Sequence, residues 1–200
     1  MRMGLLPLLF LLGACALTPR DTGKAFLFAL PPVTTAVTTT GAALAVSDSL
    51  IVALPVAAPE LDTYRIALIR KDGRRDYYAG AKWVEFLPLL VQASLTETLK
   101  DAKLYKTVAT DQSGLAGSRV LKAEIGAFQA EYAAESAPVV KITMSVSLLD
   151  RFKRIPSAAF DIRVEEKAAA DRLPEIQAAF AKAFAKAQKQ IVQELDRVLP

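Results

Sequence analysis

The 200-residue sequence has no histidine and a single cysteine, Cys15. Histidine is the commonest general acid–base residue, so its absence excludes Ser-His-Asp triads and histidine-containing metal sites. A single cysteine cannot form a disulfide within the chain, so the fold must depend on packing. The sequence also lacks a Walker loop and the G-x-G-x-x-G, G-x-S-x-G and S-x-x-K motifs. These absences favour a protein that is not an enzyme.

Paired acids are the remaining catalytic candidates. Glu165 and Glu166 are adjacent, and Glu131 and Glu135 lie close together in the sequence. Nothing in the spacing makes either pair converge on a pocket, and such pairs are common at strand ends. The formal charge is +4, from 25 basic and 21 acidic residues that are interspersed. Without a basic block, the charge pattern gives no indication of a nucleic-acid partner.

The start of the chain resembles the signal peptide of a bacterial lipoprotein. A charged start at Arg2 precedes the apolar run Leu5–Leu12, and Leu12-Gly13-Ala14-Cys15 is similar to a lipobox. The resemblance implies cleavage before Cys15, diacylglycerol on its sulfur and an acyl chain such as palmitate on its new amino group. The alternative is a free thiol in an ordinary signal peptide or a buried apolar segment. The run of eight residues is too short to span a bilayer.

Alternating apolar and polar residues predict a sheet in the rest of the chain. We expect strands over residues 25–30, 50–56, 64–70, 76–79, 105–109, 119–132, 139–150 and 158–165. Asp72-Gly73 favours a tight hairpin between the third and fourth of these strands. The last three strands are successive, which favours an antiparallel meander with one buried face.

Two amphipathic helices complete the expected fold. Their apolar periods cover residues 83–102 and 174–199, with Asp171 as a candidate N-cap of the second. Residues 59–62 could form one helical turn. We therefore predict three parts: a cleaved signal peptide over residues 1–14, a lipidated tether over 15–24 and one domain over 25–200. The fold class of the domain is α+β, a mainly antiparallel sheet packed by two long helices.

The segment from Leu50 to Val108 resembles a known family. A strand leads into Pro59-Glu60-Leu61-Asp62, a second strand follows, and an aromatic segment ends at Trp83, with Glu85 just beyond it. This order is similar to that of the ABC-type transport auxiliary lipoproteins, which accompany mammalian-cell-entry (MCE) domain lipid transporters. The resemblance covers most of the mature chain, residues 24–198.

The resemblance implies a non-enzymatic, lipid-anchored protein of the Gram-negative outer membrane that faces the periplasm. It implies an MCE-domain protein of an ABC-type lipid transporter as the partner, docked or capped so that phospholipid crosses the periplasm. Ala16 after the cysteine is not aspartate, which by analogy with lipoprotein sorting favours the outer membrane. No cofactor is expected apart from the covalent lipid on Cys15, and a homo-oligomer is compatible with these expectations.

Two other functions stay open from the residues. One is an envelope-assembly lipoprotein that regulates a peptidoglycan synthase or assists lipopolysaccharide insertion. The other is a lipid-anchored hydrolase, for which no motif is present.

Candidate partner contacts cluster around the expected hairpin. They are Trp83, Tyr77, Tyr78, Arg74 and Arg75, with Arg70 and Lys71 in the same basic group. The arginines could meet phosphate headgroups or an acidic partner surface, or they could simply be solvated at a hairpin tip. At most one of the two adjacent tyrosines belongs to the core if both lie on a strand. A lone Trp is more often a core or boundary anchor than a contact residue.

Lipidation at Cys15 gives the first testable prediction. Cys15→Ser should move the protein from the membrane fraction to the soluble periplasmic fraction, because the acyl chains are its only expected anchor. Fractionation followed by immunoblotting measures this. Intact-mass analysis of the wild-type protein should show the added acyl mass, and a membrane-bound Cys15→Ser variant would contradict the prediction.

Overall fold

The computed structural model describes residues 25–32, 49–133, 136–153 and 155–199. Cys15, the expected tether and Glu135 lie outside the described residues. The elements are β1 (Phe26–Phe28), β2 (Ser49–Val52), β3 (Val56–Ala57), β4 (Arg65–Ile69), β5 (Arg75–Trp83), α1 (Leu87–Ala102), β6 (Thr107–Thr110), the 3-10 turn η1 (Asp111–Ser113), β7 (Arg119–Glu131), β8 (Val139–Asp150), β9 (Ile155–Lys167) and α2 (Leu173–Val198). The predicted α+β class with two long helices is confirmed.

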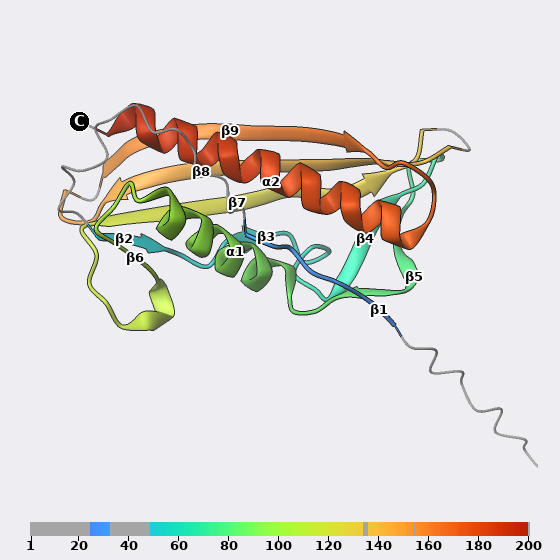
Figure 1. Cartoon of the computed structure of the whole chain (residues 1–200), viewed down its shortest axis with the longest axis horizontal. Helices are drawn as coiled ribbons and strands as arrows, with labels where there is room; N and C mark the ends of the chain where they lie inside the picture. The colour runs from blue at the N-terminus through green and yellow to red at the C-terminus, as the bar shows by residue number, and fades with distance from the viewer. Residues whose placement is uncertain (1–24, 33–48, 134–135, 154, 200) are drawn as a thin grey trace, which may run out of the picture.

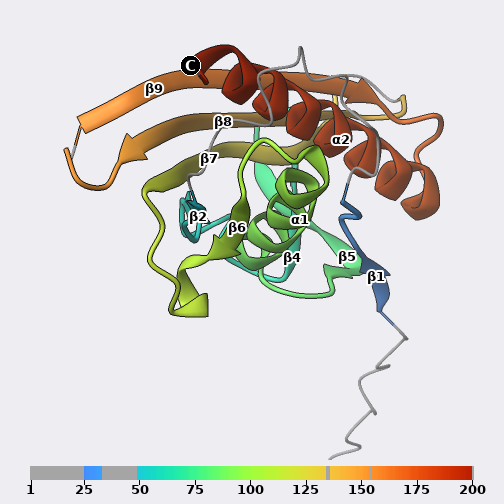
Figure 2. The ribbon, with the colours of Figure 1, turned by 60° about the vertical axis from the view of Figure 1, so that its left-hand side comes forward.

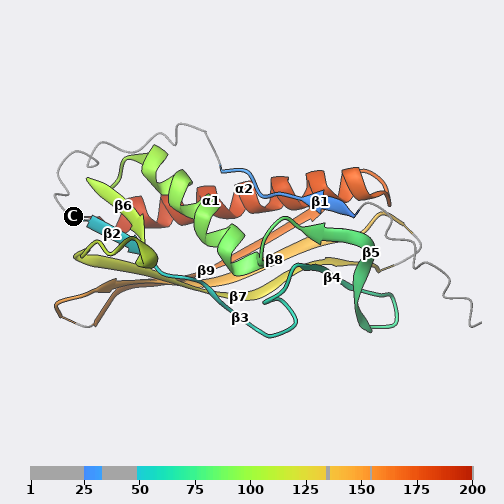
Figure 3. The ribbon, with the colours of Figure 1, turned by 90° about the horizontal axis from the view of Figure 1, so that it is seen from below.

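The described strands form one mixed nine-stranded sheet. Strands β7, β8 and β9 form the predicted antiparallel meander, each paired along nearly its whole length. On its other edge β7 pairs in parallel with β2, β3 and β4 in succession. Both helices lie on the same face of this sheet, so the domain has two layers (Figures 1 and 3).

Buried and outward-facing side chains alternate along the strands of the β7–β9 meander, as the sequence predicts. In β8, Val140, Ile142 and Met144 are buried beneath the helices, whereas Lys141 and Ser145 lie on the opposite face. A strand with one buried face needs this period of two. The outer face of the meander is therefore polar, and the three strands curve together over α2 (Figure 2).

An aromatic cluster joins the layers at the centre of the core. Phe180 of α2 stacks on Phe128 of β7, with ring centroids 5.7 Å apart, and meets Trp83 of β5 edge to face at 5.2 Å. Phe28 of β1 contacts Trp83 at 5.7 Å. Edge-to-face and offset pairs of this kind add stability beyond the area they bury.

Buried amides join the helices to each other and to the sheet. Gln188 of α2 donates from Nε2 to Ser94 Oγ at 2.9 Å and Thr98 Oγ1 at 2.8 Å, both on α1. Gln92 of α1 donates to the Val52 carbonyl at 3.0 Å and to Asp111 Oδ1 at 2.8 Å. These hydrogen bonds satisfy polar groups that would otherwise be costly in the core.

The structure corrects the expected start of the first helix. Trp83 is the last residue of β5, and α1 begins four residues later at Leu87, with Pro88 in its first turn. Trp83 stays in the sheet because its backbone N–H donates to the Tyr64 carbonyl at 2.7 Å and because it pairs with Phe28 of β1. The expected turn at residues 59–62 is present as a single hydrogen-bonded turn, in which the N–H groups of Leu61 and Asp62 both donate to the Ala58 carbonyl, at 2.8 Å and 3.0 Å.

Two further differences concern a strand and a cap. The strand expected over residues 50–56 is divided into β2 and β3, with Pro55, which has no N–H to donate, between them. The N-cap of α2 is Arg172, without a side-chain cap, so Asp171 does not cap the helix. Its carboxylate accepts a hydrogen bond from Tyr132 instead.

Truncation of the central indole should measure the strength of this core. Trp83→Ala should lower the free energy of unfolding by about 3–5 kcal/mol, because it leaves a cavity among three phenylalanine rings. Val84→Ala, at an adjacent exposed position, is the matched control and should cost less than about 1 kcal/mol. Urea unfolding, monitored by circular dichroism, measures the free energy of unfolding of both variants. Equal losses of stability in the two would contradict the placement of Trp83 in the core.

Candidate functional site

The β4–β5 hairpin closes as Asp72-Gly73 predicts. Gly73 has a φ of 81°, a conformation that glycine adopts without a steric penalty. The Gly73 N–H donates to the Arg70 carbonyl, and the Arg70 N–H donates to the Arg74 carbonyl, both at 2.8 Å. The Asp72 carboxylate accepts two hydrogen bonds from Arg74, one from the backbone N–H at 3.1 Å and one from Nε at 2.6 Å. The turn is therefore held by its own side chains as well as by its backbone.

An open cavity of about 940 Å³ lies beside this hairpin. Its walls come from β4, the hairpin turn, β5, the residue after β7 and the turn before α2. They comprise Leu68, Arg70, Lys71, Asp72, Tyr77, Tyr78, Ala79, Tyr132 and Asp171. Ligand sites of proteins usually have 300–1,000 Å³ and combine apolar walls with a few polar groups. This cavity has both properties.

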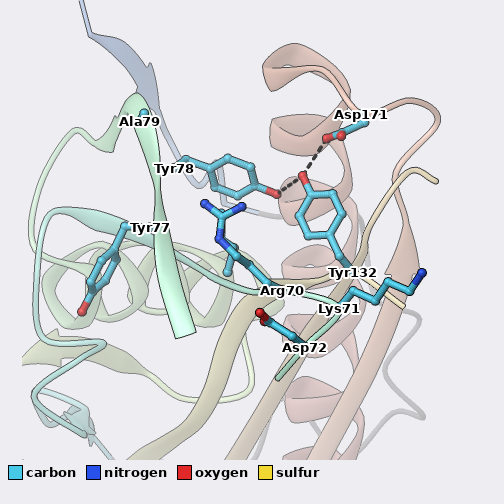
Figure 4. Close-up of a pocket in the computed structure, with 9 residues that line it drawn as sticks. Arg70, Lys71, Asp72, Tyr77, Tyr78, Ala79, Tyr132 and Asp171 are labelled. Carbon is cyan, nitrogen blue, oxygen red and sulfur yellow. Dashed lines mark hydrogen bonds between the residues drawn. The ribbon is translucent and has the colours of Figure 1, made fainter. Parts of the chain in front are cut away.

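A chain of three hydrogen-bonded side chains crosses the cavity (Figure 4). The hydroxyls of Tyr78 and Tyr132 are 3.0 Å apart, and the Tyr132 hydroxyl donates to Asp171 Oδ1 at 2.6 Å. Because Tyr132 has one proton and gives it to Asp171, Tyr78 must be the donor to Tyr132. The oxygen of Tyr78 is then left as an acceptor.

Burial makes both hydroxyls weaker acids. It raises the pKa of Tyr132 from its ordinary value near 10 to about 12, and the hydrogen bond to Asp171 acts in the same direction. Burial also raises the pKa of Tyr78, and the hydrogen bond to Tyr132 raises it further. Both rings therefore stay protonated across the physiological range.

The charges around the cavity are partly paired. Arg70 donates from Nε at 2.8 Å and from Nη2 at 2.5 Å to Asp76 Oδ2, which raises the pKa of Arg70 and lowers that of Asp76. Asp72 is held by Arg74. In the described part of the chain, Lys71 and Asp171 form no ion pair.

The structure separates the five predicted contact residues. Tyr78 takes part in the hydrogen-bonded chain. Tyr77 lines the cavity, but it points away from the other two rings (Figure 4). The Tyr77 hydroxyl donates to the Glu60 carbonyl at 3.2 Å, and the Arg65 guanidinium lies 3.7 Å above its ring.

Neither predicted arginine lines the cavity, since Arg74 pairs with Asp72 and Arg75 with Glu60 at 3.0 Å. Both remain exposed on the hairpin, where a partner could reach them. Trp83 is 1 % exposed, so its side chain belongs to the core and is not on a surface that a partner could reach.

The predicted paired acids that the structure describes are each held in an ion pair with a lysine. Glu131 and Glu165 lie on either side of Lys141, whose Nζ is 2.7 Å and 3.6 Å from them, and Glu166 pairs with Lys186. Among the described residues, no three His, Cys, Asp or Glu side chains could hold a metal ion together. None of the described helices is both long and apolar enough to cross a membrane.

Sequence reasoning missed Tyr132 as a site residue and gave Asp171 another role. The two are 39 residues apart in sequence and meet only because β7 ends beside the turn before α2. A tyrosine just beyond a long strand was the only local signal. Leu68 and Ala79 gave no signal, because small and apolar residues are common in every strand of this sheet.

Comparison with known proteins identifies the family and the fold. The model of the family described as ABC-type transport auxiliary lipoprotein component matches residues 28–194. The crystal structure of protein XCC0632 from Xanthomonas campestris, of family DUF330, is similar with a TM-score of 0.74 and 22% identity, covering 87% of this chain and 96% of that one. The hypothetical protein CT253 from Chlamydia trachomatis has a TM-score of 0.52 at 8% identity, with 74% of this chain and 95% of that one covered. No curated protein matches the chain in sequence. At these identities the two structures show a shared fold.

The buried hydroxyls should make stability depend on alkaline pH. A tyrosine whose pKa is raised by folding contributes stability that is complete below pH 10 and is lost as the pH rises through about 12. The free energy of unfolding should therefore fall between pH 9 and pH 11 less steeply in a Tyr78→Phe, Tyr132→Phe double variant than in the wild type. Urea unfolding at the two pH values measures the difference, and equal slopes would contradict the assignment.

Proposed function

This chain belongs to the family of ABC-type transport auxiliary lipoprotein components, and from that premise we propose a specific role for it. The protein is a non-enzymatic lipoprotein of the outer membrane, anchored through Cys15 and facing the periplasm. It docks onto or caps the periplasm-spanning MCE-domain protein of an ABC-type lipid transporter. The function is structural: the domain positions the end of a lipid conduit against the membrane.

The extent of the family match is the observation that supports this proposal most. Residues 28–194 run from the last residue of β1 to a point four residues before the end of α2, so the match includes both layers and the whole aromatic core. The auxiliary role therefore belongs to the entire domain and not to a short motif. An auxiliary component of transport implies a transporter as its partner.

A sealed junction between such a domain and a conduit has a clear physical purpose. Exposing an acyl chain to water costs roughly 0.8 kcal/mol for each CH₂ group. A lipid that crosses the periplasm therefore needs a continuous apolar path. A docked domain at the membrane end would prevent water from entering this path.

The β4–β5 hairpin offers a surface for docking. Arg74 and Arg75 are exposed and have only exposed acidic partners, Asp72 and Glu60. Exposed pairs of this kind contribute little to stability, so the arginines can exchange partners at little cost. An acidic surface on the transporter protein would match them and would speed association.

A pull-down from solubilised membranes tests the proposal. The wild-type protein should recover an MCE-domain protein, and Cys15→Ser should recover much less because the two partners are no longer held at one membrane. Recovery of a cell-wall synthase or a lipopolysaccharide-insertion protein in its place would overturn the proposal.

Charge reversal tests the docking surface separately. Arg74→Glu with Arg75→Glu should reduce recovery about tenfold, because two like charges would face the acidic partner. Arg151→Glu with Lys153→Glu makes the same change of charge in the turn between β8 and β9 and is the matched control. Equal recovery with both double variants would exclude the β4–β5 hairpin as the contact.

A further inference from the structure

The β7–β9 meander ends in a long strand with a free edge. β9 has 13 residues, and among the described residues β8 is its one strand partner. β9 therefore forms a margin of the sheet (Figures 1 and 2). The strands at the two ends of the main strand order, β1 and β6, have three and four residues. The edge of β9 is much longer, and it leaves a row of backbone N–H and C=O groups open to a further strand.

The middle of β9 lacks the features that block an edge strand. Proteins usually protect such an edge with a proline, a bulge or a charged side chain on the packed face of the sheet. In β9, Pro156 and the one register shift in the pairing with β8 lie near the start. Glu166, which pairs with Lys186 at 2.6 Å, lies near the end. Residues 158–165 contain no proline, lysine or bulge, so this part of the edge is available for pairing.

Two opposite charges lie side by side on the outer face of this middle part. Asp161 and Arg163 are both exposed, and Arg163 Nη2 lies 3.4 Å from Asp161 Oδ2. The other carboxylate oxygen, Oδ1, accepts from Ser145 Oγ of β8 at 2.8 Å. Ile162, between the two charges, is 2 % exposed and belongs to the core. A negative and a positive side chain therefore flank Ile162 on one face of the strand.

This order of charges is self-complementary when two copies of β9 run antiparallel. If Ile162 of one copy lies opposite Ile162 of the other, then Asp161 lies opposite the second copy's Arg163, and Arg163 lies opposite its Asp161. Directly opposite residues have Cβ atoms about 4.5–5.5 Å apart, and opposite charges at such positions stabilise the pairing. Each charge then has two neighbours of opposite sign, one in its own strand and one across the interface.

Other registers of the same two strands match less well. A register with Asp161 opposite itself, or with Arg163 opposite itself, brings like charges together, which is destabilising. A register with Val164 opposite itself keeps opposite charges together but pairs only residues 161–167. The charges therefore select the register that has Ile162 opposite itself.

The register centred on Ile162 also matches the two faces along most of the strand. It pairs residues 157–167, and each charged residue in this range lies opposite a residue of the other sign or an uncharged one. Phe160, which is partly buried against the core, lies opposite the second copy's Val164. A register centred on Phe160 would instead bring Pro156, which has no N–H to donate, into the pairing. The favoured register thus extends both the backbone ladder and the apolar face.

We propose that two copies of this protein join through β9 as an antiparallel, two-fold symmetric dimer with Ile162 at the axis. The two nine-stranded sheets become one continuous sheet, with the helices of both copies on the same face. Such a contact uses the same surface on both copies, so it closes at two and does not grow into a fibre. The second copy covers the long edge that the single chain leaves open. This inference goes beyond the proposed function and does not use the transporter partner.

Disulfide trapping tests the register of the dimer. Asp161→Cys and Arg163→Cys are made separately in the full-length chain with Cys15→Ser, with different tags, and are mixed. The mixture should form a covalent dimer on mild oxidation, because opposite residues have Cα atoms about 4.5–5.5 Å apart, within the range of a disulfide. Non-reducing gel electrophoresis measures the product.

Each single-cysteine variant alone is the matched control for the mixture. In a dimer of one variant the two cysteines lie on a diagonal, about 7–8 Å apart, which is too far for a disulfide. Neither variant alone should therefore cross-link efficiently. Equal cross-linking of the mixture and of the single variants, or none in the mixture, would overturn the proposed register.

Charge reversal and charge exchange test the contact in solution. In the Cys15→Ser chain, Arg163→Asp should weaken dimerisation at least about tenfold, because like charges then lie opposite each other. Asp161→Arg combined with Arg163→Asp should restore the dimer, because opposite charges face each other again. Lys122→Asp makes the same charge change on the outer face of β7, away from the edge, and should have no effect. Sedimentation equilibrium measures all four proteins.

Three outcomes of the sedimentation experiment would overturn the dimer. The first is a Cys15→Ser chain that stays monomeric up to about 1 mM. The second is equal weakening by Arg163→Asp and Lys122→Asp. The third is a charge-exchanged variant as weak as the single reversal. A return of dimerisation on charge exchange would support the proposal, since a merely unfolded variant would not recover.

The dimer and the proposed transporter partner can fail separately. A protein that dimerises through β9 but recovers no MCE-domain protein would overturn the proposed function alone. A monomeric protein that recovers its partner would overturn the dimer alone. If Arg163→Asp abolished that recovery in a monomeric protein, the edge of β9 would belong to the transporter protein and not to a second copy.

Discussion

Strand β7 is the element on which the rest of the domain depends, because both of its edges are occupied. One edge pairs with β8 from Arg119 to Glu131, and the other pairs with β2, β3 and β4 in turn. A slip of one residue in β7 would send every one of its core side chains to the opposite face. Phe128, which contacts Trp83, Phe180 and Phe184, fixes the register from the helical side.

The cavity follows from this arrangement at the end of β7. Tyr132 is the first residue beyond the strand, and its N–H still donates to the Ile69 carbonyl of β4 at 2.9 Å. This places its ring between the β4–β5 hairpin and the turn that leads into α2. The wall residues therefore come from parts of the chain that are distant in sequence, and the central strand aligns them.

Local pattern was sufficient for the elements and insufficient for their pairing. The period of two in β7 to β9 and the apolar stripe of α2 were visible because each depends on neighbours a few residues away. The end of β5 was not visible in the local pattern, because Trp83 is kept in the sheet by its pairing with Phe28, which lies 55 residues earlier in the chain. The parallel pairing of β7 with three short strands also depends on contacts between distant segments. In the candidate site, Tyr78 and the hairpin charges were found from sequence, whereas the meeting of Tyr132 with Asp171 required the fold.

The pairing of β1 with β5 bears on how the domain would resist mechanical load. Only three residues of β1 pair with β5, and they run parallel to it. A force applied along the axis of β1 would therefore shear its hydrogen bonds to β5 together and not unzip them one at a time. Phe28, wedged against Trp83 and Phe180, would have to leave the core before the strand could slide.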